Sequence, residues 1–414
     1  MFANLHSLMP SSLNICVQGE GKYGDEFVLV ADSDMRLKKI LFVDDSVPFF
    51  LAHRLPLARA ACDAGYEVHV ATPDSPLSGT LQKHGLHFHA IPMLRSSTRV
   101  WKELRSLRAL VGLYRHLCPD LVHHAAIKPV LYGGVAARLA KVPAAVYAIS
   151  GLGHMFVERG TKARLLRSIV KQVYGFVFSH PHDKIIFQNP DDRQLMLQAQ
   201  LVTATDSILI RGSGVDMEMF TPRPEAEGPP VVVLAARMLW EKGGGEFVDA
   251  ARQLREQKVD ARFILAGESD PGNPSAVPVW QLEQWHDSGV VEWLGACDDM
   301  ARIFAEAHVV CLPSYREGLP KVLIEAAACG RPIVTTDVPG CREVVRHEEN
   351  GLLVPARNPA ALAAALRRLI TSAVLRQFLG QRGREIAVAE FALEKVVAQT
   401  LAIYEEMLSD QTVS

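Results

Sequence analysis

Short apolar runs alternate with amphipathic stretches along the first half of the chain, beginning at Lys39. Residues 40–43 form the first run. A stretch with helical periodicity follows from about residue 51 to residue 64, where Gly65 is placed to end a helix. Further apolar runs of strand length occupy residues 67–71, 87–91, 121–124, 144–149 and 184–188. Strands that alternate with helices predict parallel βαβ units with right-handed crossovers, and therefore a doubly wound sheet.

A second series of the same kind begins near residue 230, after a stretch that is rich in Pro, Glu and Gly. Its apolar runs occupy residues 231–235, 261–266, 290–294, 309–312 and 332–335. The pattern predicts an α/β chain with two Rossmann-like domains, 38–222 and 231–392, joined by a linker at 223–230 and followed by a helical segment, 393–414. Loops at the carboxyl ends of both sheets would line a cleft, where such folds bind ligands.

The first 37 residues do not share this alternation. They lack the basic start and the apolar core of a secretory signal peptide. Met35 stands shortly before the first predicted strand, so translation could begin there. We therefore expect residues 1–37 to be an extension outside the fold, either disordered or the product of a misassigned start.

Composition argues against a membrane-spanning segment, because no apolar run approaches the ~20 residues that a spanning helix needs. The 7 cysteines are scattered without metal-ligand spacing, which argues against a zinc site and is typical of a reducing compartment. The net charge is −2 at pH 7, but the first half is basic and the second half is acidic. Either the first half faces an anionic partner, or the imbalance is chance variation on a solvated surface.

Two segments of the first half are both basic and amphipathic, residues 95–117 and residues 159–177. In the first, Arg and Lys side chains alternate with Trp101 and a series of leucines. Such helices bind anionic membrane surfaces, although a helix that packs on a core and exposes a solvated basic face has the same pattern. We expect an anionic membrane surface as a partner, and no nucleic acid.

The segment from residue 313 to residue 343 places two glutamates around the start of a predicted ten-residue helix. Pro320 suits the first position of this helix, and Gly330 suits the left-handed position after its end. The helix N-terminus would present free N–H groups and a positive dipole end to an anion in the cleft. Glu317 precedes the helix, and Glu325 lies within it among apolar residues. At that position a carboxylate either binds a ligand or, on a surface helix, faces water.

A second group of charged residues follows the first strand of the second domain. Arg237 and Lys242 stand at the carboxyl end of that strand, and Gly243 begins a run of three glycines that allows close approach of a ligand to the backbone. Fixed cations at this place can neutralise a diphosphate leaving group, although basic residues after a strand commonly only cap or solvate it.

Glu317 and Glu325 match the E-x7-E pattern of retaining GT-B glycosyltransferases. The flanking P-S-x-x-E-G-x-P and A-x-x-C-G-x-P-I-V sequences resemble glycosyltransferase family 4, and the similarity extends from Lys38 nearly to the C-terminus. The resemblance implies a GT-B fold in which the C-terminal helix packs back on the first domain. It also implies that Glu325 binds the nucleotide ribose, that Glu317 contacts the donor sugar, and that Arg237 and Lys242 hold the donor phosphates.

The same resemblance supplies the remaining donor-site residues. The expected catalytic residues are Glu317, Arg237 and Lys242, and the further donor contacts are Glu325, Gly318, Leu319, Pro320, Lys321, Gly295 and Gly214. Enzymes of this type are expected to use fixed cations and a helix N-terminus in place of a bound Mg²⁺. We therefore expect no metal site, and no cofactor besides the nucleotide-sugar substrate.

Two further segments, residues 124–129 and 149–154, resemble a narrower subgroup that extends sugars on polyprenyl-diphosphate carriers in surface-polysaccharide assembly. Many family members have a histidine where this chain reads Ser-Gly-Leu-Gly at 150–153, and a histidine follows that stretch here. The expected acceptor-binding residues are Arg54, Lys128, Gly151, Gly153 and His154.

We therefore expect a glycosyltransferase that moves a hexose or N-acetylhexosamine, with retention, from a nucleoside-diphosphate sugar to a polyprenyl-diphosphate-linked saccharide. UDP is the expected nucleotide, and the expected location is the cytoplasm, peripheral on the inner face of the membrane. A dinucleotide oxidoreductase fits less well, because no G-x-G-x-x-G follows the first strand. A GT-B sugar-nucleotide epimerase or hydrolase would share the nucleotide contacts. A non-catalytic GT-B partner subunit would be expected to lose Lys242 or a motif glutamate.

Overall fold

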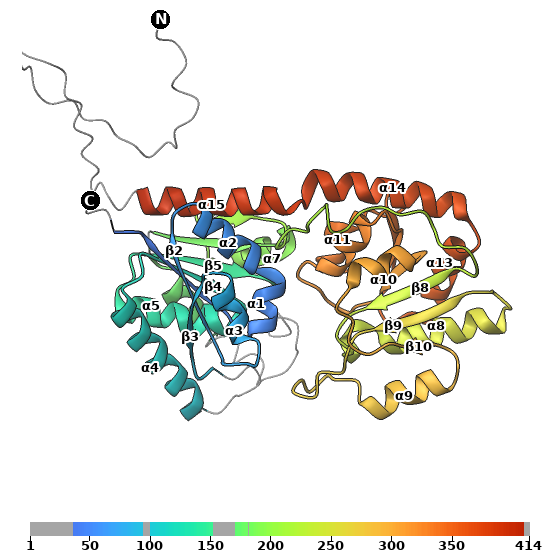
Figure 1. The fold of residues 1–414 in the computed structure, drawn as a ribbon, viewed down its shortest axis with the longest axis horizontal. Helices are drawn as coiled ribbons and strands as arrows, with labels where there is room; N and C mark the ends of the chain where they lie inside the picture. The colour runs from blue at the N-terminus through green and yellow to red at the C-terminus, as the bar shows by residue number, and fades with distance from the viewer. Residues whose placement is uncertain (1–35, 94–99, 152–169, 181, 410–414) are drawn as a thin grey trace, which may run out of the picture. The chain divides into compact units, whose positions relative to one another are not determined.

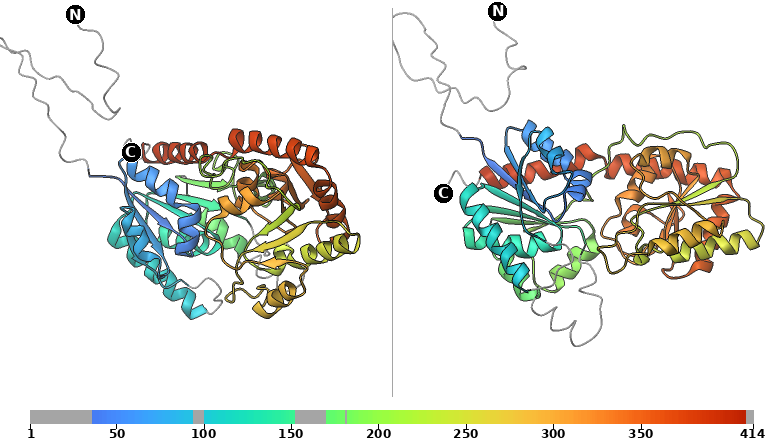
Figure 2. Two further views of the ribbon diagram at one scale, coloured as in Figure 1. Left: turned by 45° about the vertical axis from the view of Figure 1, so that its right-hand side comes forward. Right: turned by 60° about the horizontal axis from the view of Figure 1, so that its bottom comes forward.

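The computed structural model of the chain describes residues 36–93, 100–151, 170–180 and 182–409. It divides into two units, residues 1–37 and residues 38–414. Within the described residues of the second unit, helices cover both faces of two parallel β-sheets, one in each half of the chain (Figures 1 and 2). The predicted α/β class with two Rossmann-like sheets is confirmed.

Seven parallel strands make up the first sheet in the part of the chain that the structure describes, in the order β3-β2-β1-β4-β5-β6-β7. Their bounds are β1 Lys39–Val43, β2 Glu67–Thr72, β3 His87–Ala90, β4 Leu121–Ala125, β5 Ala144–Ile149, β6 Asp183–Phe187 and β7 Ser207–Leu209. The chain order reverses between β1 and β4. The carboxyl ends of these two strands therefore mark the place where such sheets bind ligands.

The helices of the first half pack on both faces of this sheet. They are α1 Val47–His53, α2 Leu55–Asp63, α3 Ser78–Lys83, α4 Val100–Leu117, α5 Gly134–Ala140 and α7 Pro190–Gln198, with a π-helical turn η1 at Pro129–Gly133. Ile40 and Phe42 of β1 share a core with α1 and α2, whereas Leu41 and Val43 share another with α4 and α5. Because side chains alternate across a strand, this one short apolar run supplies both cores.

The sequence predicted one helix over residues 51–64, but the structure has two helices that meet at Arg54. The prediction was wrong because Pro56 lacks the N–H that would donate to the carbonyl oxygen of Ala52, and α1 consequently ends at His53. Helix α1 also begins earlier than predicted. The break separates α2 from α1. It also leaves the carbonyl oxygen of Ala52 without the hydrogen bond that a backbone N–H would donate to it in a continuous helix.

Six parallel strands form the second sheet, within the fully described residues 182–409, in the order β10-β9-β8-β11-β12-β13. Their bounds are β8 Val231–Ala235, β9 Arg262–Ala266, β10 Glu292–Trp293, β11 Val309–Leu312, β12 Ile333–Thr336 and β13 Gly351–Val354. The order reverses between β8 and β11, so the ligand-binding end of this sheet lies after those two strands.

The helices of the second half again cover both faces of their sheet. They are α8 Gly244–Glu256, α9 Val279–Asp287, α10 Met300–Glu306, α11 Lys321–Ala328, α12 Cys341–Val344, α13 Pro359–Ile370 and α14 Ala373–Glu390, with a 3₁₀ turn η3 at Trp240–Lys242. Two apolar cores lie on the two faces. Among all the described residues, no helix is both long enough and apolar enough to cross a membrane.

Three local predictions differ from the structure. The edge strands β7 and β13 were not predicted, because runs of three and four residues are too short for strand periodicity to stand out. Helix α11 has eight residues rather than ten. Pro320 caps this helix in an extended conformation (φ −74°, ψ 105°) instead of occupying its first turn, whereas Gly330 has the expected positive φ of 68°.

The C-terminal helix α15, Leu393–Ser409, packs on the first half of the chain, while the preceding α14 lies along the second half (Figures 1 and 2). Val396, Ile403 and Met407 enter the core that β1, α1 and α2 share. The hydroxyl of Tyr404 forms a buried hydrogen bond of 2.6 Å with Nδ1 of His123 on β4. The C-terminal helices therefore connect the two halves.

Replacing Tyr404 by Phe is expected to destabilise the fold by about 1–2 kcal/mol, because the buried imidazole of His123 loses its Nδ1 partner. Nε2 of His123 is already buried without a hydrogen-bond partner in the described part of the chain. Chemical unfolding should compare this variant with Tyr66→Phe, a half-buried tyrosine beside the same core. Equal unfolding free energies for the two variants would contradict the expectation.

Candidate active site

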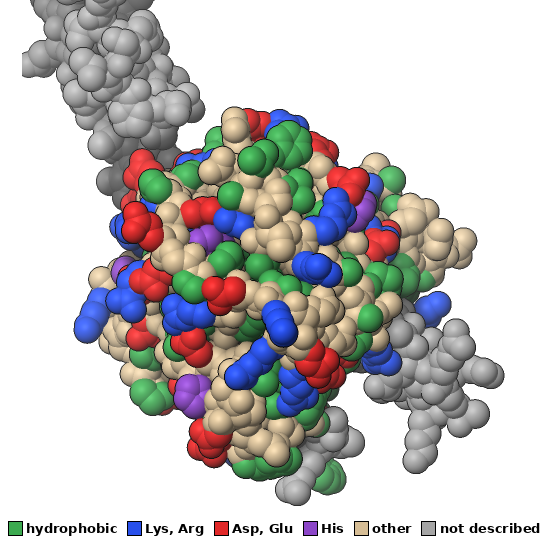
Figure 3. Space-filling view, turned by 90° about the vertical axis from the view of Figure 1, so that its right-hand side faces the viewer, with side chains coloured by type: hydrophobic (Ala, Val, Ile, Leu, Met, Phe, Trp, Pro, Cys, Tyr) green, Lys and Arg blue, Asp and Glu red, His purple; other side chains and the backbone are tan. Residues whose placement is uncertain are grey.

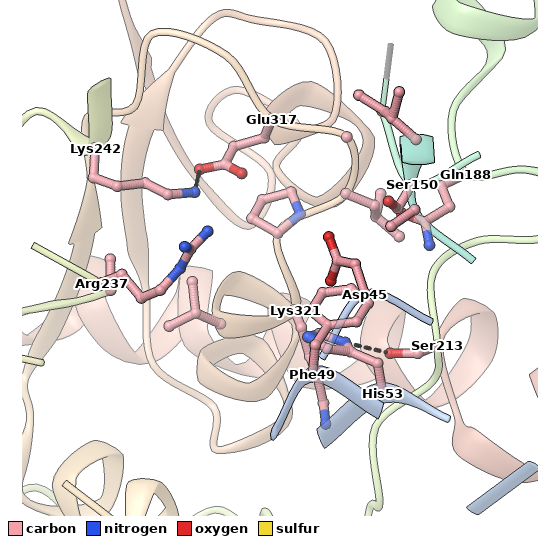
Figure 4. A pocket seen from close by; sticks show the side chains of 18 of the residues that line it. Asp45, Phe49, His53, Ser150, Gln188, Ser213, Arg237, Lys242, Glu317 and Lys321 are labelled. Atoms are coloured by element: carbon pink, nitrogen blue, oxygen red, sulfur yellow. Dashed lines mark hydrogen bonds and ion pairs between the residues drawn. The ribbon is translucent and has the colours of Figure 1, made fainter. Parts of the chain in front are cut away.

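A cavity of about 720 Å³ is lined by residues that follow the carboxyl ends of both sheets. The first half contributes residues after β1, β4, β5 and β6, and the second half contributes residues after β8 and β11. The cavity includes the two places where the strand order reverses, between β1 and β4 and between β8 and β11. The predicted cleft is therefore present, and charged side chains enter it from more than one side (Figure 4).

The carboxylate of Glu317 is held by two donors. Its Oε1 accepts hydrogen bonds from Nζ of Lys242 at 2.5 Å and from Oγ of Ser314 at 2.6 Å. Lys242 ends the turn η3, and Gly243 follows it with a φ of 77°. A Cβ atom at Gly243 would lie 2.3 Å from the carbonyl oxygen of Pro313, so only glycine allows the two loops to lie this close together.

Arg237 enters the cavity from the same side as Lys242 (Figure 4). Its Nη1 donates to Oδ2 of Asp270 at 2.7 Å, and about half of its side chain is exposed. A guanidinium has five N–H donors, more than one carboxylate can occupy, so Arg237 can donate to a ligand in the cavity as well. Two permanent cations thus stand on one wall of the cavity.

Glu325 is 13% exposed on α11, and burial raises its pKa, an effect that Lys321 opposes. Nζ of Lys321 lies 3.6 Å from Oε1 of Glu325 and donates to the carbonyl oxygen of Ala52 at 2.7 Å. Ala52 is the residue whose helical donor is missing because of Pro56. The possibility that Glu325 lies on a surface helix and faces water is excluded by its burial. Lys321 lines the cavity, whereas Glu325 is not among the lining residues.

The loop that carries Glu317 touches the first half of the chain. A Cβ atom at Gly318 would lie 1.7 Å from the carbonyl oxygen of Ser150. Nδ2 of Asn189, the N-cap of α7, donates to the carbonyl oxygen of Gly318 at 2.8 Å. Nη2 of Arg316 lies 3.2 Å from Oδ1 of Asp192 in the first turn of α7. These contacts fix the loop against both halves.

The opposite wall of the cavity is formed by α1 and its neighbours (Figure 4). Nδ1 of His53 forms a hydrogen bond of 3.1 Å with Oγ of Ser213. Burial, with the nearby cations of Lys321 and Arg54, lowers the pKa of His53 to about 3. His53 is therefore neutral near pH 7. It can donate or accept one hydrogen bond toward a ligand but is a weak base.

Each half of the chain matches a model of a known protein family. The family model of "Glycosyl transferases group 1" matches residues 229–372, and that of "Glycosyl transferase 4-like" matches residues 39–189. Together they cover the second sheet, all of the first sheet except β7, and the residues that line the cavity except Ser213. The chain is a glycosyltransferase.

Two curated relatives match the glycosyltransferase over most of its length. The N,N'-diacetylbacillosaminyl-diphospho-undecaprenol alpha-1,3-N-acetylgalactosaminyltransferase of Campylobacter jejuni is 28% identical over 86% of this chain and 96% of its own length. The UDP-Gal:alpha-D-GlcNAc-diphosphoundecaprenol alpha-1,3-galactosyltransferase of Escherichia coli is 24% identical over 77% of this chain and 83% of its own length.

The solved structure of HepE from Anabaena in complex with UDP has the same fold. It superposes with a TM-score of 0.72 at 20% identity, over 89% of this chain and all of that one. Together with the two doubly wound sheets, this likeness confirms the GT-B fold that the sequence resemblance implied.

The structure brings most of the predicted donor residues of the glycosyltransferase together. The cavity is lined by Arg237, Lys242, Glu317, Gly318, Leu319, Pro320 and Lys321. Gly214 instead packs against the start of α15, where an added Cβ atom would lie 2.6 Å from Cα of Leu393. The carbonyl oxygen of Gly295 accepts from the N–H of Gly267 at 2.8 Å, away from the cavity lining. Donor binding by Gly214 and Gly295 stays a prediction.

The predicted acceptor residues divide into three groups. Gly151 lines the cavity, and a Cβ atom added to it would lie 3.4 Å from Cα of Gly318. Arg54 lines it from a buried position, and Lys128 lines it while its Nζ is bonded to Oε1 of Glu103 at 2.9 Å. Gly153 and His154 lie outside the described residues.

Six polar or aromatic residues that line the cavity were not among the predicted site residues: Asp45, Phe49, His53, Ser150, Gln188 and Ser213. Five of them directly follow a strand or lie in the helix after β1. The rule that ligands bind at the carboxyl ends of strands next to the order reversal could have found these five. Ser213 lies beyond β7, a strand that the sequence pattern did not reveal.

Replacing Gly318 by Ala is expected to lower the rate of sugar transfer by about 100-fold, because the new methyl group would overlap the Ser150 carbonyl and displace the loop that holds Glu317. The measurement is the transfer rate at saturating donor, together with the unfolding midpoint. Gly79→Ala is the matched control, since no atom lies within 4 Å of its added Cβ. A Gly318→Ala enzyme with the transfer rate of the control would show that the close approach is not required.

Proposed function

We propose that this glycosyltransferase moves a hexose or N-acetylhexosamine from a UDP-sugar, with retention, to a polyprenyl-diphosphate-linked saccharide in surface-polysaccharide synthesis. The observation that carries the proposal is the cavity in which Arg237, Lys242 and Lys321 surround the loop of Glu317. The names of the two curated relatives, which specify diphospho-undecaprenol-linked saccharides, support the acceptor class. The UDP bound by HepE, on the same fold, supports the nucleotide.

The leaving diphosphate would be stabilised by fixed charges. Arg237 and Lys242 enter from one side, and the N–H groups near residues 318–321 precede α11, whose positive dipole end faces the cavity. Preformed charges of this kind stabilise a departing anion strongly inside a closed cleft. We propose that transfer is independent of a metal ion. In the described residues no group of three or more His, Cys, Asp or Glu side chains is arranged to hold one.

Glu317 has a binding role in this proposal rather than that of a nucleophile. Its Oε1 already accepts hydrogen bonds from Lys242 and Ser314. These bonds stabilise the carboxylate and lower its tendency to attack an anomeric carbon. In a transfer on one face of the sugar, the leaving phosphate itself can take the proton of the acceptor hydroxyl. Glu325 would accept hydrogen bonds from the nucleotide ribose after Lys321 moves aside.

Two rival functions of this fold differ from the proposal in what they require. An epimerase or hydrolase needs the same nucleotide contacts but no acceptor. A non-catalytic subunit would be expected to lose part of the charged set, yet Arg237, Lys242, Glu317 and Glu325 are all present. The intact set favours catalysis, and the buried contact between the two halves favours a site that uses residues of both.

We also propose that the first half binds an anionic membrane surface through α4. Trp101 at the start of this helix is 82% exposed, and Lys102, Arg105 and Arg108 are exposed beside it. The opposite side of α4 packs in the core through Leu110 and other buried residues. The face of the second half seen in Figure 3 instead intermixes acidic and basic side chains. Of the other basic segment, residues 159–169 lie outside the described part of the chain.

Titration calorimetry in EDTA with UDP, GDP and NAD tests the proposed donor site. UDP is expected to bind without added metal. Lys242→Ala should weaken UDP binding by about 10- to 100-fold, because a charge-assisted hydrogen bond to phosphate is lost. Lys83→Ala, an exposed lysine at the end of α3, is the matched control. Tight binding of GDP instead would change the donor, and binding of NAD alone would overturn the proposal.

Sedimentation with lipid vesicles tests the membrane proposal. Reversing the charge of Arg105 and Arg108 to Glu is expected to reduce binding to vesicles containing anionic lipid by at least about tenfold, since each basic residue contributes ~1 kcal/mol. The control reverses the exposed Arg252 and Arg302 of the second half. If both double variants bind as the wild type does, α4 is not the membrane contact.

A further inference from the structure

The wall of the cavity formed by the first half contains a carboxylate and an aromatic ring that the proposed donor chemistry does not use. Asp45 follows β1, and Phe49 lies one turn into α1. Both line the cavity. In Figure 4, Asp45 points into the cavity from the side opposite Arg237 and Lys242. The two side chains thus face the same space as the donor-binding cations.

We propose that Asp45 and Phe49 form the subsite for the terminal sugar of the acceptor, in which Asp45 accepts a hydrogen bond from a hydroxyl of that sugar other than the reacting one and Phe49 packs on the sugar ring. This inference rests on the proposed function, because it names residues that would hold the acceptor in that reaction.

The local structure holds both side chains in place. The N–H of Asp45 donates to Oδ1 of Asp44 at 2.7 Å, and Asp44 is itself buried at the end of β1. Oγ of Ser46 caps α1 by accepting from the N–H of Phe49 at 3.2 Å. Phe50, the next residue, enters the core under α1. Asp44, Ser46 and Phe50 therefore hold the turn between β1 and α1 in place, and Asp45 and Phe49 of this turn line the cavity.

Basic side chains line the cavity from both halves, Arg54 and Lys128 from the first and Arg237, Lys242 and Lys321 from the second, and the carboxylate of Asp45 lies on the first-half wall. A diphosphate is attracted to Arg237 and Lys242 and is repelled by the carboxylate of Asp45. The neutral, hydroxyl-bearing part of a ligand is the part that a carboxylate can bind, since it accepts hydrogen bonds from hydroxyl groups. A donor bound with its diphosphate on the cationic wall therefore leaves the wall of Asp45 for the acceptor.

An aromatic ring beside a carboxylate suits a sugar in particular. The ring of Phe49 packs against His53 with centroids 4.2 Å apart, which limits its motion. The open face of a fixed phenyl ring can cover the C–H face of a pyranose, while polar groups at its edge bind the hydroxyls. Ser150 and Gln188, which line the same cavity, supply such polar groups in addition to Asp45.

Steady-state kinetics with the full-length enzyme tests this subsite. The probes are farnesyl diphosphates that carry one neutral hexose or one N-acetylhexosamine, used with the UDP-sugars that the enzyme binds. Asp45→Ala is expected to lower kcat/KM for the neutral acceptor by about 10- to 100-fold, and Asp45→Asn by less, because the amide oxygen still accepts a hydrogen bond. Phe49→Ala should raise the acceptor KM about tenfold, and Phe49→Tyr should restore it.

Calorimetric affinity for UDP separates acceptor binding from a general disturbance of the cavity. The Asp45 and Phe49 variants are expected to bind UDP as tightly as the wild type. Asp63→Ala, an exposed carboxylate at the end of α2, is the matched control and should keep wild-type kinetics.

The outcomes distinguish this inference from the proposed function. A wild-type enzyme that binds no UDP, or transfers sugar to none of the carriers, overturns the proposed function and the subsite with it. A wild-type enzyme that transfers sugar while the Asp45 and Phe49 variants match it in acceptor kcat/KM overturns the subsite alone. Loss of UDP affinity in parallel with acceptor kinetics also contradicts the subsite.

Discussion

The close contact between Gly318 and Ser150 is the constraint on which the site depends. No side chain fits between the two backbones, and the Gly318 carbonyl is further held by Asn189 of the first half. On its other side the loop is equally crowded, since a Cβ at Gly340 would lie 2.4 Å from the same carbonyl oxygen. The loop that carries Glu317 is thus held between Ser150 and Asn189 on one side and Gly340 on the other. The bond of Glu317 to Lys242 lies within the second half, and the Gly318 contact joins that pair to the first half.

A second contact between the halves follows from a single proline. Pro56 has no N–H that could donate to the carbonyl oxygen of Ala52. This oxygen instead accepts a hydrogen bond from Nζ of Lys321. The same ammonium group lies beside Glu325, whose buried carboxylate would otherwise have little compensation for its desolvation. In the proposed function, a nucleotide that binds Glu325 would compete with Lys321, the group that also joins the halves. Donor binding would then be coupled to the relative position of the halves through this lysine.

The sequence predicted the features that depend on a local pattern of residues. It did not predict the features that depend on contacts between residues far apart in the chain. The buried strands appear as apolar runs, and the loop from Pro313 to Pro320 is recognisable from its motif. The pairing of Lys128 with Glu103 joins residues far apart in the chain, so it could not be read from the sequence. The break at Arg54 was readable from Pro56 but was missed, because the apolar periodicity continues across it. Asp45 was passed over because no motif marks it.

The two contacts at the cleft are complemented by a connection through the C-terminal helices. Helix α14 packs on α11, where a Cβ at Gly380 would lie 2.0 Å from the carbonyl oxygen of Gly330. Helix α15 then enters the core of the first half and bonds His123 through Tyr404. Helix α11 carries Glu325, so this carboxylate is linked to the first half both through Lys321 and through α14 and α15. Separating the halves would break polar contacts at the cleft while leaving the larger apolar contacts of α15 intact. The cleft is therefore the side of this structure at which opening costs least.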